Sequence, residues 1–194
     1  MDKTLKLHKA LQKYICELLP KNEGIIEQPF PGHFADIAWE REMIIFEIQC
    51  SPIPIEVVVK RNNDYTQLGF SVVWILHQKT FNKKYVTKSE YFLRKNTCYY
   101  TNFTLTGRGY VYDQLEHFNK NIRIIKSSPL QVDISKPFRK KTQLTFKGDK
   151  FHQKPDILSL FENKKLSTNL SIFKKILNKY DSILTNILKK ISSL

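Results

Sequence analysis

Phe34-Ala-Asp-Ile-Ala-Trp39 and Met43-Ile-Ile-Phe-Glu-Ile-Gln-Cys-Ser51 are the two stretches that decide the fold. Both read as strands, and the short polar segment between them predicts a turn that joins them. Three polar side chains interrupt this otherwise apolar text, and they are Asp36, Glu47 and Gln49. Glu47 and Gln49 are two residues apart, so on a strand they point to the same face. An unpaired buried carboxylate is costly, and hard divalent cations prefer carboxylate oxygens. The pattern therefore indicates a metal site.

The sequence around these strands predicts an α/β (α+β) sandwich with a mixed sheet. Residues 4–19 carry apolar side chains at helical spacing, and residues 24–28 are a short strand candidate. Residues 29–33 are expected to form a rigid loop. Ser51-Pro-Ile-Pro54 is expected to begin a helix over 55–68, with Ser51 as its cap and Gly69 as its stop. Residues 71–76 predict a buried strand. The resulting order is helix, strand, strand, strand, helix, strand, with the last strand parallel to its neighbour.

The pattern beyond residue 77 is weaker. It predicts a short helix near 89–94, strands within 97–103 and 109–112, and another short strand at 122–125. We expect one domain over residues 1–130 with its core at 4–77, a linker or extended arm over 131–155, and a tail of basic amphipathic helices over 156–194.

Positive charge is concentrated in the second part of the chain. The 194 residues have a formal net charge of +14, yet residues 1–76 hold 8 Lys or Arg and 10 Asp or Glu. The excess of positive charge therefore belongs to residues 77–194. Such an asymmetry favours contact with a polyanion, DNA above all. The alternative is a set of solvated surface lysines.

Three cysteines, Cys16, Cys50 and Cys98, show no paired spacing and no zinc pattern. We interpret them as reduced thiols. The chain begins without the apolar run of a signal peptide, and its apolar runs are too short to span a membrane. These features predict a cytoplasmic protein without a transmembrane segment.

Glu27, Asp36 and Glu47-Ile-Gln49 resemble the active-site strands of the PD-(D/E)xK nuclease superfamily. The text from Ala35 to Ile53, with Arg61-Asn-Asn-Asp-Tyr65 and Val73-Trp-Ile-Leu76, more specifically resembles the CoiA-like competence family. The resemblance covers roughly residues 5–77. It implies a restriction-endonuclease-like core, a nuclease-like domain and a link to natural transformation. It also implies DNA as the substrate.

The resemblance implies a role for each of six site residues. Asp36 and Glu47 would bind Mg²⁺ or Mn²⁺, and the alternative is a turn cap and a lysine partner. Gln49 stands where the superfamily usually has lysine, and an amide cannot act as a general base. It would orient water, or only complete a hydrogen-bond network. Glu27 would hold the metal through water or accept from Arg61, or be an ordinary edge-strand residue. Arg61 and Tyr65 share one helix face. Arg61 would hold Glu47 or a scissile phosphate, and Tyr65 would order the carboxylates or simply pack.

Four further residues are candidates for DNA contact, and they are His8, His33, Lys60 and Arg108. His8 lies beside the apolar stripe of the first helix, where it would reach the metal site or be structural. His33 is expected to be exposed, and Lys60 would supply a missing positive charge. Arg108 lies within a run that includes Tyr99, Tyr100, Phe103 and Tyr110. That run suits stacking on single-stranded bases or packing under a sheet. Trp39 and Trp74 are expected in the core.

Three functions remain open from the sequence. The first is a Mg²⁺- or Mn²⁺-dependent nuclease that hydrolyses DNA, single-stranded or branched substrates included. The second is a DNA-binding accessory of uptake or recombination with weak or no cleavage, which Gln49 favours and which would work with other competence or recombination proteins. The third is a basic protein that docks on a membrane surface or a partner through residues 156–194.

Overall fold

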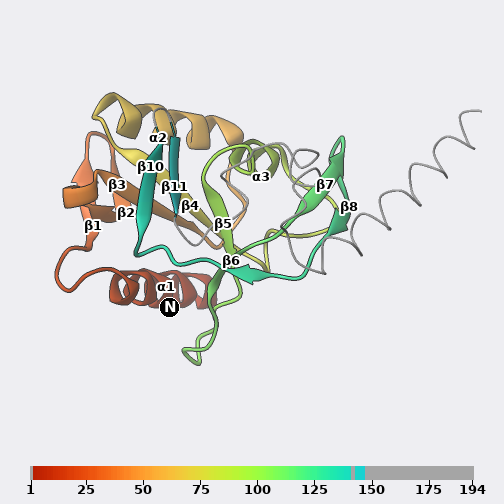
Figure 1. Cartoon of the computed structure of the whole chain (residues 1–194), viewed down its shortest axis with the longest axis horizontal. Helices are drawn as coiled ribbons and strands as arrows, with labels where there is room; N and C mark the ends of the chain where they lie inside the picture. The colour runs from red at the N-terminus through yellow and green to blue at the C-terminus, as the bar shows by residue number, and fades with distance from the viewer. Residues whose placement is uncertain (1, 141–142, 147–194) are drawn as a thin grey trace, which may run out of the picture. The chain divides into compact units, whose positions relative to one another are not determined.

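A seven-stranded mixed sheet with helices on both faces forms the centre of the computed structural model, which describes residues 2–140 and 143–146 (Figure 1). The helices are α1 (Lys3–Leu18), the 3-10 turn η1 (Glu40–Glu42), α2 (Ile55–Gln67) and α3 (Lys88–Leu93). The strands of the sheet, in spatial order, are β1 (Ile25–Phe30), β2 (His33–Trp39), β3 (Ile44–Gln49), β4 (Ser71–His77), β5 (Cys98–Thr101), β6 (Val111–Asp113) and β9 (Leu130–Gln131). Two separate ribbons are β7 (Glu116–Asn119) with β8 (Ile122–Lys126), and β10 (Pro137–Lys140) with β11 (Gln143–Phe146).

The predicted order of elements is confirmed by α1, β1, β2, β3, α2 and β4. β1, β2 and β3 pair antiparallel, whereas β3 pairs with β4 and β4 with β5 in parallel. Parallel neighbours need a crossover connection, and here the crossovers carry α2 and α3. The β10–β11 ribbon lies within the segment expected to be a linker or arm. The expected helices over 156–194 lie outside the described residues.

The two faces of the sheet bury two different apolar sets. Alternating residues of β2 and β3 send Ile37 and Phe46 toward Leu11 and Ile15 of α1. The opposite face packs against α2 and α3, where Trp74 is 1% exposed. Trp39 is 3% exposed. Both tryptophans therefore belong to the core, as the sequence predicted.

Local corrections concern the two turns next to the site. Residues 29 and 30 belong to β1, and Pro29 faces Phe34, so the expected loop shrinks to a two-residue turn. Proline fits here because β1 is an edge strand and its missing N–H faces no partner strand. Ser51 does not cap α2, because Pro54 occupies the N-cap position. Gly69 does end α2, with a φ of +85° that glycine adopts without strain.

Beyond β4 the sheet grows further than the predicted core. Tyr99 and Tyr100 on β5 are 0% exposed and Phe103 is 5% exposed, so the aromatic run packs in the core. Of the two alternatives that the sequence left open for this run, packing under a sheet is confirmed for Tyr99, Tyr100 and Phe103, and base stacking by these three rings is not. Strands of a parallel sheet are buried on both faces and carry continuous rather than alternating apolar side chains, as β5 does.

A buried network of charges fixes the β7–β8 ribbon and α3 to the sheet. Arg94 bonds Asp113 and Glu116 at 2.5 Å each, and Arg123 bonds Glu116 at 2.9 Å and Glu90 at 2.7 Å. None of these five side chains is more than 7% exposed. Buried charges persist only when they are paired and hydrogen-bonded. The network therefore holds together segments that the apolar pattern alone does not.

Candidate active site

Asp36 lies where β2 and β3 separate. The ladder between them runs from Trp39 and Ile44 to Ile37 and Phe46, and one further step would place Asp36 opposite Glu47. There, the Asp36 Oδ2 atom accepts the backbone N–H of Ile48 at 2.6 Å. The carboxylate thus replaces a backbone acceptor at the point where the ladder stops. Its position between the strands makes it accessible from more than one element.

Helix α1 supplies two side-chain partners of the Asp36 carboxylate. His8 Nε2 lies 2.9 Å from Asp36 Oδ1, and the Gln12 amide donates to the same oxygen at 3.5 Å. Burial lowers the pKa of His8, but hydrogen bonds to Asp36 and Cys50 outweigh burial and raise the pKa to about 10. His8 is therefore an imidazolium at neutral pH. The positively charged His8 ring contacts the Asp36 carboxylate, and the His8 side chain is 24% exposed.

Glu47 is the buried acid of the site, at 1% exposure. The Tyr65 hydroxyl donates to Glu47 Oε1, and Arg61 Nη1 donates to Oε2 at 2.5 Å. Burial raises the pKa of Glu47, the negative charge of Asp36 raises it further, and Arg61 and Tyr65 oppose both, which leaves the pKa at about 7. The register of β2 and β3 and the effect of the Asp36 charge on the pKa of Glu47 both point to neighbouring carboxylates.

Helix α2 positions both partners of Glu47. Arg61 and Tyr65 are one turn apart, so they share the face that packs on β3. Tyr65 is fully buried, and the nearby Glu47 adds to burial in raising the pKa of its hydroxyl far above the usual value. Tyr65 is therefore a neutral donor. Arg61 remains 28% exposed, so its guanidinium lies at the border between the buried acid and solvent.

Gln49 ends β3 on the same side of the strand as Glu47. Its amide nitrogen donates to the Ser51 carbonyl at 2.7 Å and lies 3.3 Å from the Ser51 hydroxyl. The side chain is thus held against the following turn. Gln49 therefore lies at the edge of the site, and its amide carries no charge.

Three of the residues considered in the sequence lie away from these contacts. Glu27 is exposed and has a φ of +55°, and the β1–β2 register passes over it. Arg61 bonds Glu47, which was one of its two expected roles, and not Glu27. Lys60 pairs with Asp64 at 2.7 Å on the exposed face of α2. Arg108 is exposed in the turn between β5 and β6. The resemblance and the local patterns that suggested these residues carry no information on tertiary distance.

His33 was expected to be exposed, and this was wrong. Its side chain is 10% exposed, lies 3.7 Å from Asp64, and meets the Tyr65 ring edge-on with the ring centroids 5.0 Å apart. Burial first, and then the positive charge of Arg61, lower the pKa of His33. It is therefore a neutral ring that packs behind Tyr65.

Cys50 is the neighbour of the site that the sequence analysis missed. It is 7% exposed, packs on the α1 face of the sheet and hydrogen-bonds His8. The alternation of β3 could have found it, because Ile48 and Cys50 point to the face opposite Glu47. That face is the one covered by α1, which carries His8.

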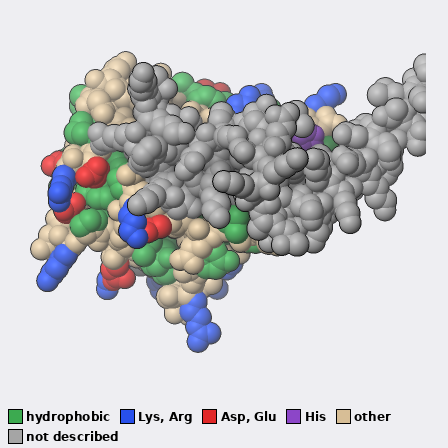
Figure 2. Space-filling view, in the orientation of Figure 1, with side chains coloured by type: hydrophobic (Ala, Val, Ile, Leu, Met, Phe, Trp, Pro, Cys, Tyr) green, Lys and Arg blue, Asp and Glu red, His purple; other side chains and the backbone are tan. Residues whose placement is uncertain are grey.

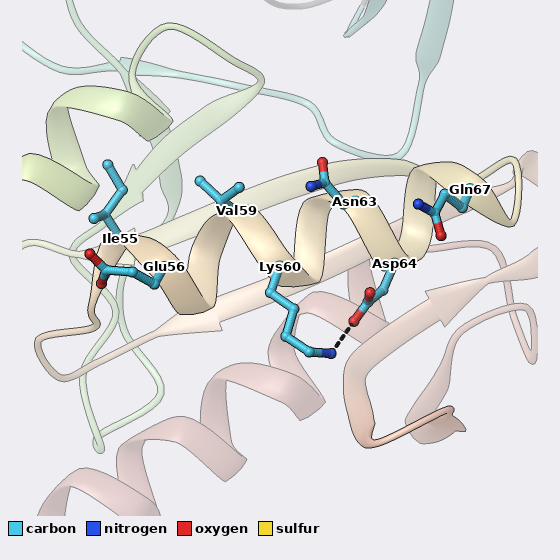
Figure 3. Close-up of a pocket in the computed structure, with 7 residues that line it drawn as sticks. All are labelled: Ile55, Glu56, Val59, Lys60, Asn63, Asp64 and Gln67. Atoms are coloured by element: carbon cyan, nitrogen blue, oxygen red, sulfur yellow. Dashed lines mark hydrogen bonds and ion pairs between the residues drawn. The ribbon is translucent and has the colours of Figure 1, made fainter.

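A pocket on α2 is separate from this site (Figure 3). The side chains that line it are Ile55, Glu56, Val59, Lys60, Asn63, Asp64 and Gln67. Arg61 and Tyr65 are not among them, so the pocket lies on the face of α2 turned away from Glu47. It offers no route to the paired carboxylates.

Two carboxylates suit a hard divalent cation in kind, because Mg²⁺ is commonly held by one or two carboxylates plus waters and substrate phosphates. Asp36 and Glu47 repel each other, which a cation between them would relieve. Among the described residues there is no group of three His, Cys, Asp or Glu side chains arranged for a metal. A cation would therefore be bound by two side chains, and it would compete with Arg61 for Glu47.

Comparison with known proteins gives one family. The model of the family described as "Competence protein CoiA, nuclease-like domain" matches residues 32–148. The match includes Asp36, Glu47, Gln49, Arg61 and Tyr65, and it begins after α1. Searches of curated proteins and of solved structures found no match.

Proposed function

The chain belongs to the family of the nuclease-like domain of competence protein CoiA, and from this premise we propose that it hydrolyses phosphodiester bonds of DNA with Mg²⁺ or Mn²⁺. The observation that carries the proposal is the place of Asp36 on β2, one register step beyond the ladder and opposite Glu47 on β3, together with the effect of its charge on Glu47. Two acids that repel each other at the point where β2 and β3 separate would form a site for a divalent cation and a phosphate. The proposal places the protein in the cytoplasm, where its three free cysteines stay reduced.

Asp36 and Glu47 would hold the cation, which would polarise the phosphodiester and lower the pKa of a bound water. The chain's own residues supply the remaining functions. His8, a partly exposed imidazolium on Asp36, would hold a phosphate oxygen. Arg61 would leave Glu47 for the phosphate as the cation takes its place. Gln49 would orient water, since its amide has no basic group to remove a proton.

A second function is favoured by Gln49 and Arg61 together. Gln49 provides no charge, and Arg61 already neutralises Glu47 at 2.5 Å. A site in which Arg61 keeps Glu47 from a cation and Gln49 supplies no charge would bind DNA without cutting it. The protein would then be an accessory of DNA uptake or recombination that acts with other competence proteins.

The decisive experiment is cleavage of supercoiled plasmid and of single-stranded circular DNA by the full chain with Mn²⁺ or Mg²⁺. We expect nicking that EDTA abolishes and that Asp36→Asn lowers by at least about 100-fold, since both metal-ligand carboxylates are needed. Glu40→Gln, which removes an exposed carboxylate from the same hairpin, is the matched control. Mn²⁺ should also raise the Tm of the parent and not that of Asp36→Asn. DNA binding without cleavage in either cation would favour the accessory function.

A further inference from the structure

Helix α3 and the β7–β8 ribbon form one unit at the side of the sheet. The backbone N–H of Val86 donates to the Asn121 carbonyl at 2.8 Å, and that of Arg123 donates to the Lys84 carbonyl at 2.8 Å. Tyr85 and Ile122 form an isolated antiparallel β-bridge. From the other strand of the ribbon, β7, the Phe118 ring meets the Tyr91 ring of α3 with the ring centroids 5.6 Å apart. These contacts join residues 83–95 and 116–126 into one unit, whose elements α3, β7 and β8 are labelled in Figure 1.

Charge is divided by sign between the inside and the outside of this unit. All three acids between residues 78 and 130 are buried, and they are Glu90, Asp113 and Glu116. Arg94 and Arg123 neutralise them from within. The exposed lysines of the unit are Lys83, Lys84, Lys88, Lys95, Lys120 and Lys126, and exposed Lys79 precedes the unit in the chain. The outer surface is thus positive without any exposed acid in this part of the described chain. Figure 2 shows Lys and Arg side chains in blue at several places on the visible face of the molecule.

The positive charges are close enough to affect one another. Burial lowers the pKa of Lys126, the charges of Arg123 and Lys83 lower it further, and the buried acids Glu116 and Glu90 oppose them only in part. Such crowding costs free energy in the isolated protein. A polyanion that binds there would offset the cost and release counterions.

Two aromatic rings stand among these lysines. Tyr85 is 65% exposed and Tyr91 is 38% exposed. The Lys84 ammonium lies 6.0 Å from the Tyr85 ring centroid, and that of Lys95 lies 4.5 Å from the Tyr91 ring centroid. Exposed aromatics beside cations are the arrangement on which bases of a single strand stack while lysines hold its phosphates. Duplex DNA keeps its bases inside and could use only the lysines.

We propose that this surface, formed by the six lysines of the unit with Tyr85 and Tyr91, binds single-stranded DNA. The inference rests on the proposed function only in taking DNA as the polyanion. It names the part of the chain that holds the strand, which lies outside the carboxylate site. The lysines contact phosphates, and the two tyrosines stack on bases.

The test measures binding of the full chain to a 20-nucleotide fluorescent single strand, and to the matching duplex, by fluorescence anisotropy in EDTA. The variant Tyr85→Ala/Tyr91→Ala should bind the single strand roughly 10- to 100-fold more weakly and the duplex nearly as well as the parent. Tyr85→Phe/Tyr91→Phe keeps both rings and should bind like the parent. Circular dichroism would establish that each variant is folded.

The lysines are tested through salt dependence. Lys83→Gln/Lys84→Gln/Lys95→Gln should reduce the slope of log K against log salt by about 2, near 0.7 per phosphate contact. Lys3→Gln/Lys13→Gln/Lys21→Gln removes the same charge from exposed positions elsewhere and should leave the slope within about 0.5 of the parent.

The inference is overturned if the tyrosine-to-alanine variant binds the single strand within twofold of the parent, or if both lysine sets act equally. Plasmid cleavage separates this result from the function proposed above. A parent that cuts DNA while the tyrosines have no effect on binding refutes the surface alone. A parent that binds through Tyr85 and Tyr91 but cuts nothing refutes the nuclease alone.

Discussion

Replacing Glu47 by glutamine tests the electrostatics of the candidate site, because the change removes the buried charge and keeps the shape of the side chain. The pKa of Glu47 is about 7 in the folded protein against 4.5 for an ordinary glutamate. Since the folded-state pKa is the higher one, the folded protein binds the proton more tightly between these values. The free energy of unfolding of the parent should therefore fall as pH rises from 4.5 to 7, by about 3 kcal/mol from this group alone.

The assay is urea unfolding, followed by circular dichroism, of the parent and Glu47→Gln at several pH values from 5 to 8 without divalent cations. The variant lacks the titrating group, so its free energy of unfolding should rise relative to the parent as pH increases and level off above pH 7. A difference that stays constant within about 0.5 kcal/mol would refute the raised pKa. A parent that gains on the variant with rising pH would show that attraction to Arg61 outweighs burial.

Three further predictions concern stability. Arg94→Met should lower the free energy of unfolding by about 3–5 kcal/mol, measured in urea at pH 7, because it leaves the fully buried Asp113 carboxylate without its cation; a loss below about 1 kcal/mol would contradict it. His8 has a pKa raised to about 10 by Asp36, so its stabilising effect is present below pH 6.5 and is lost as pH rises through 10. His8→Gln should therefore cost stability at pH 6 and little at pH 10.5, and equal costs at both would rule out the ion pair. Gly109→Ala should lower the Tm by several degrees, because an added Cβ would lie 2.4 Å from backbone at a φ of +136°; an unchanged Tm would show that the turn adjusts.

The elements around the candidate site could be predicted because their signals are local. Helical spacing marks α1, the alternation of β2 and β3 marks the hairpin, and Gly69 marks the end of α2. The same alternation places Glu47 and Gln49 on one face. Asp36 and Glu47 could be paired from the antiparallel register that a short turn imposes.

Signals that depend on distant residues were missed. The β7–β8 ribbon is anchored by Arg123, whose partners Glu90 and Glu116 come from α3 and from β7. None of those charges is recognisable as buried from its sequence neighbours.

No helix within residues 2–140 and 143–146 could span a membrane.

The sequence by itself determined which residues form the core sheet and which acids interrupt it, because hydrophobic periodicity follows directly from strand and helix geometry. Only the tertiary structure decided the partners of those acids. His8 reaches Asp36 from 28 residues away, and Arg61 reaches Glu47 from 14. It also decided which aromatic residues are exposed, burying Tyr100 and leaving Tyr85 outside. Burial and charge pairing are properties of the packed chain, and they are set by whatever the fold brings into contact.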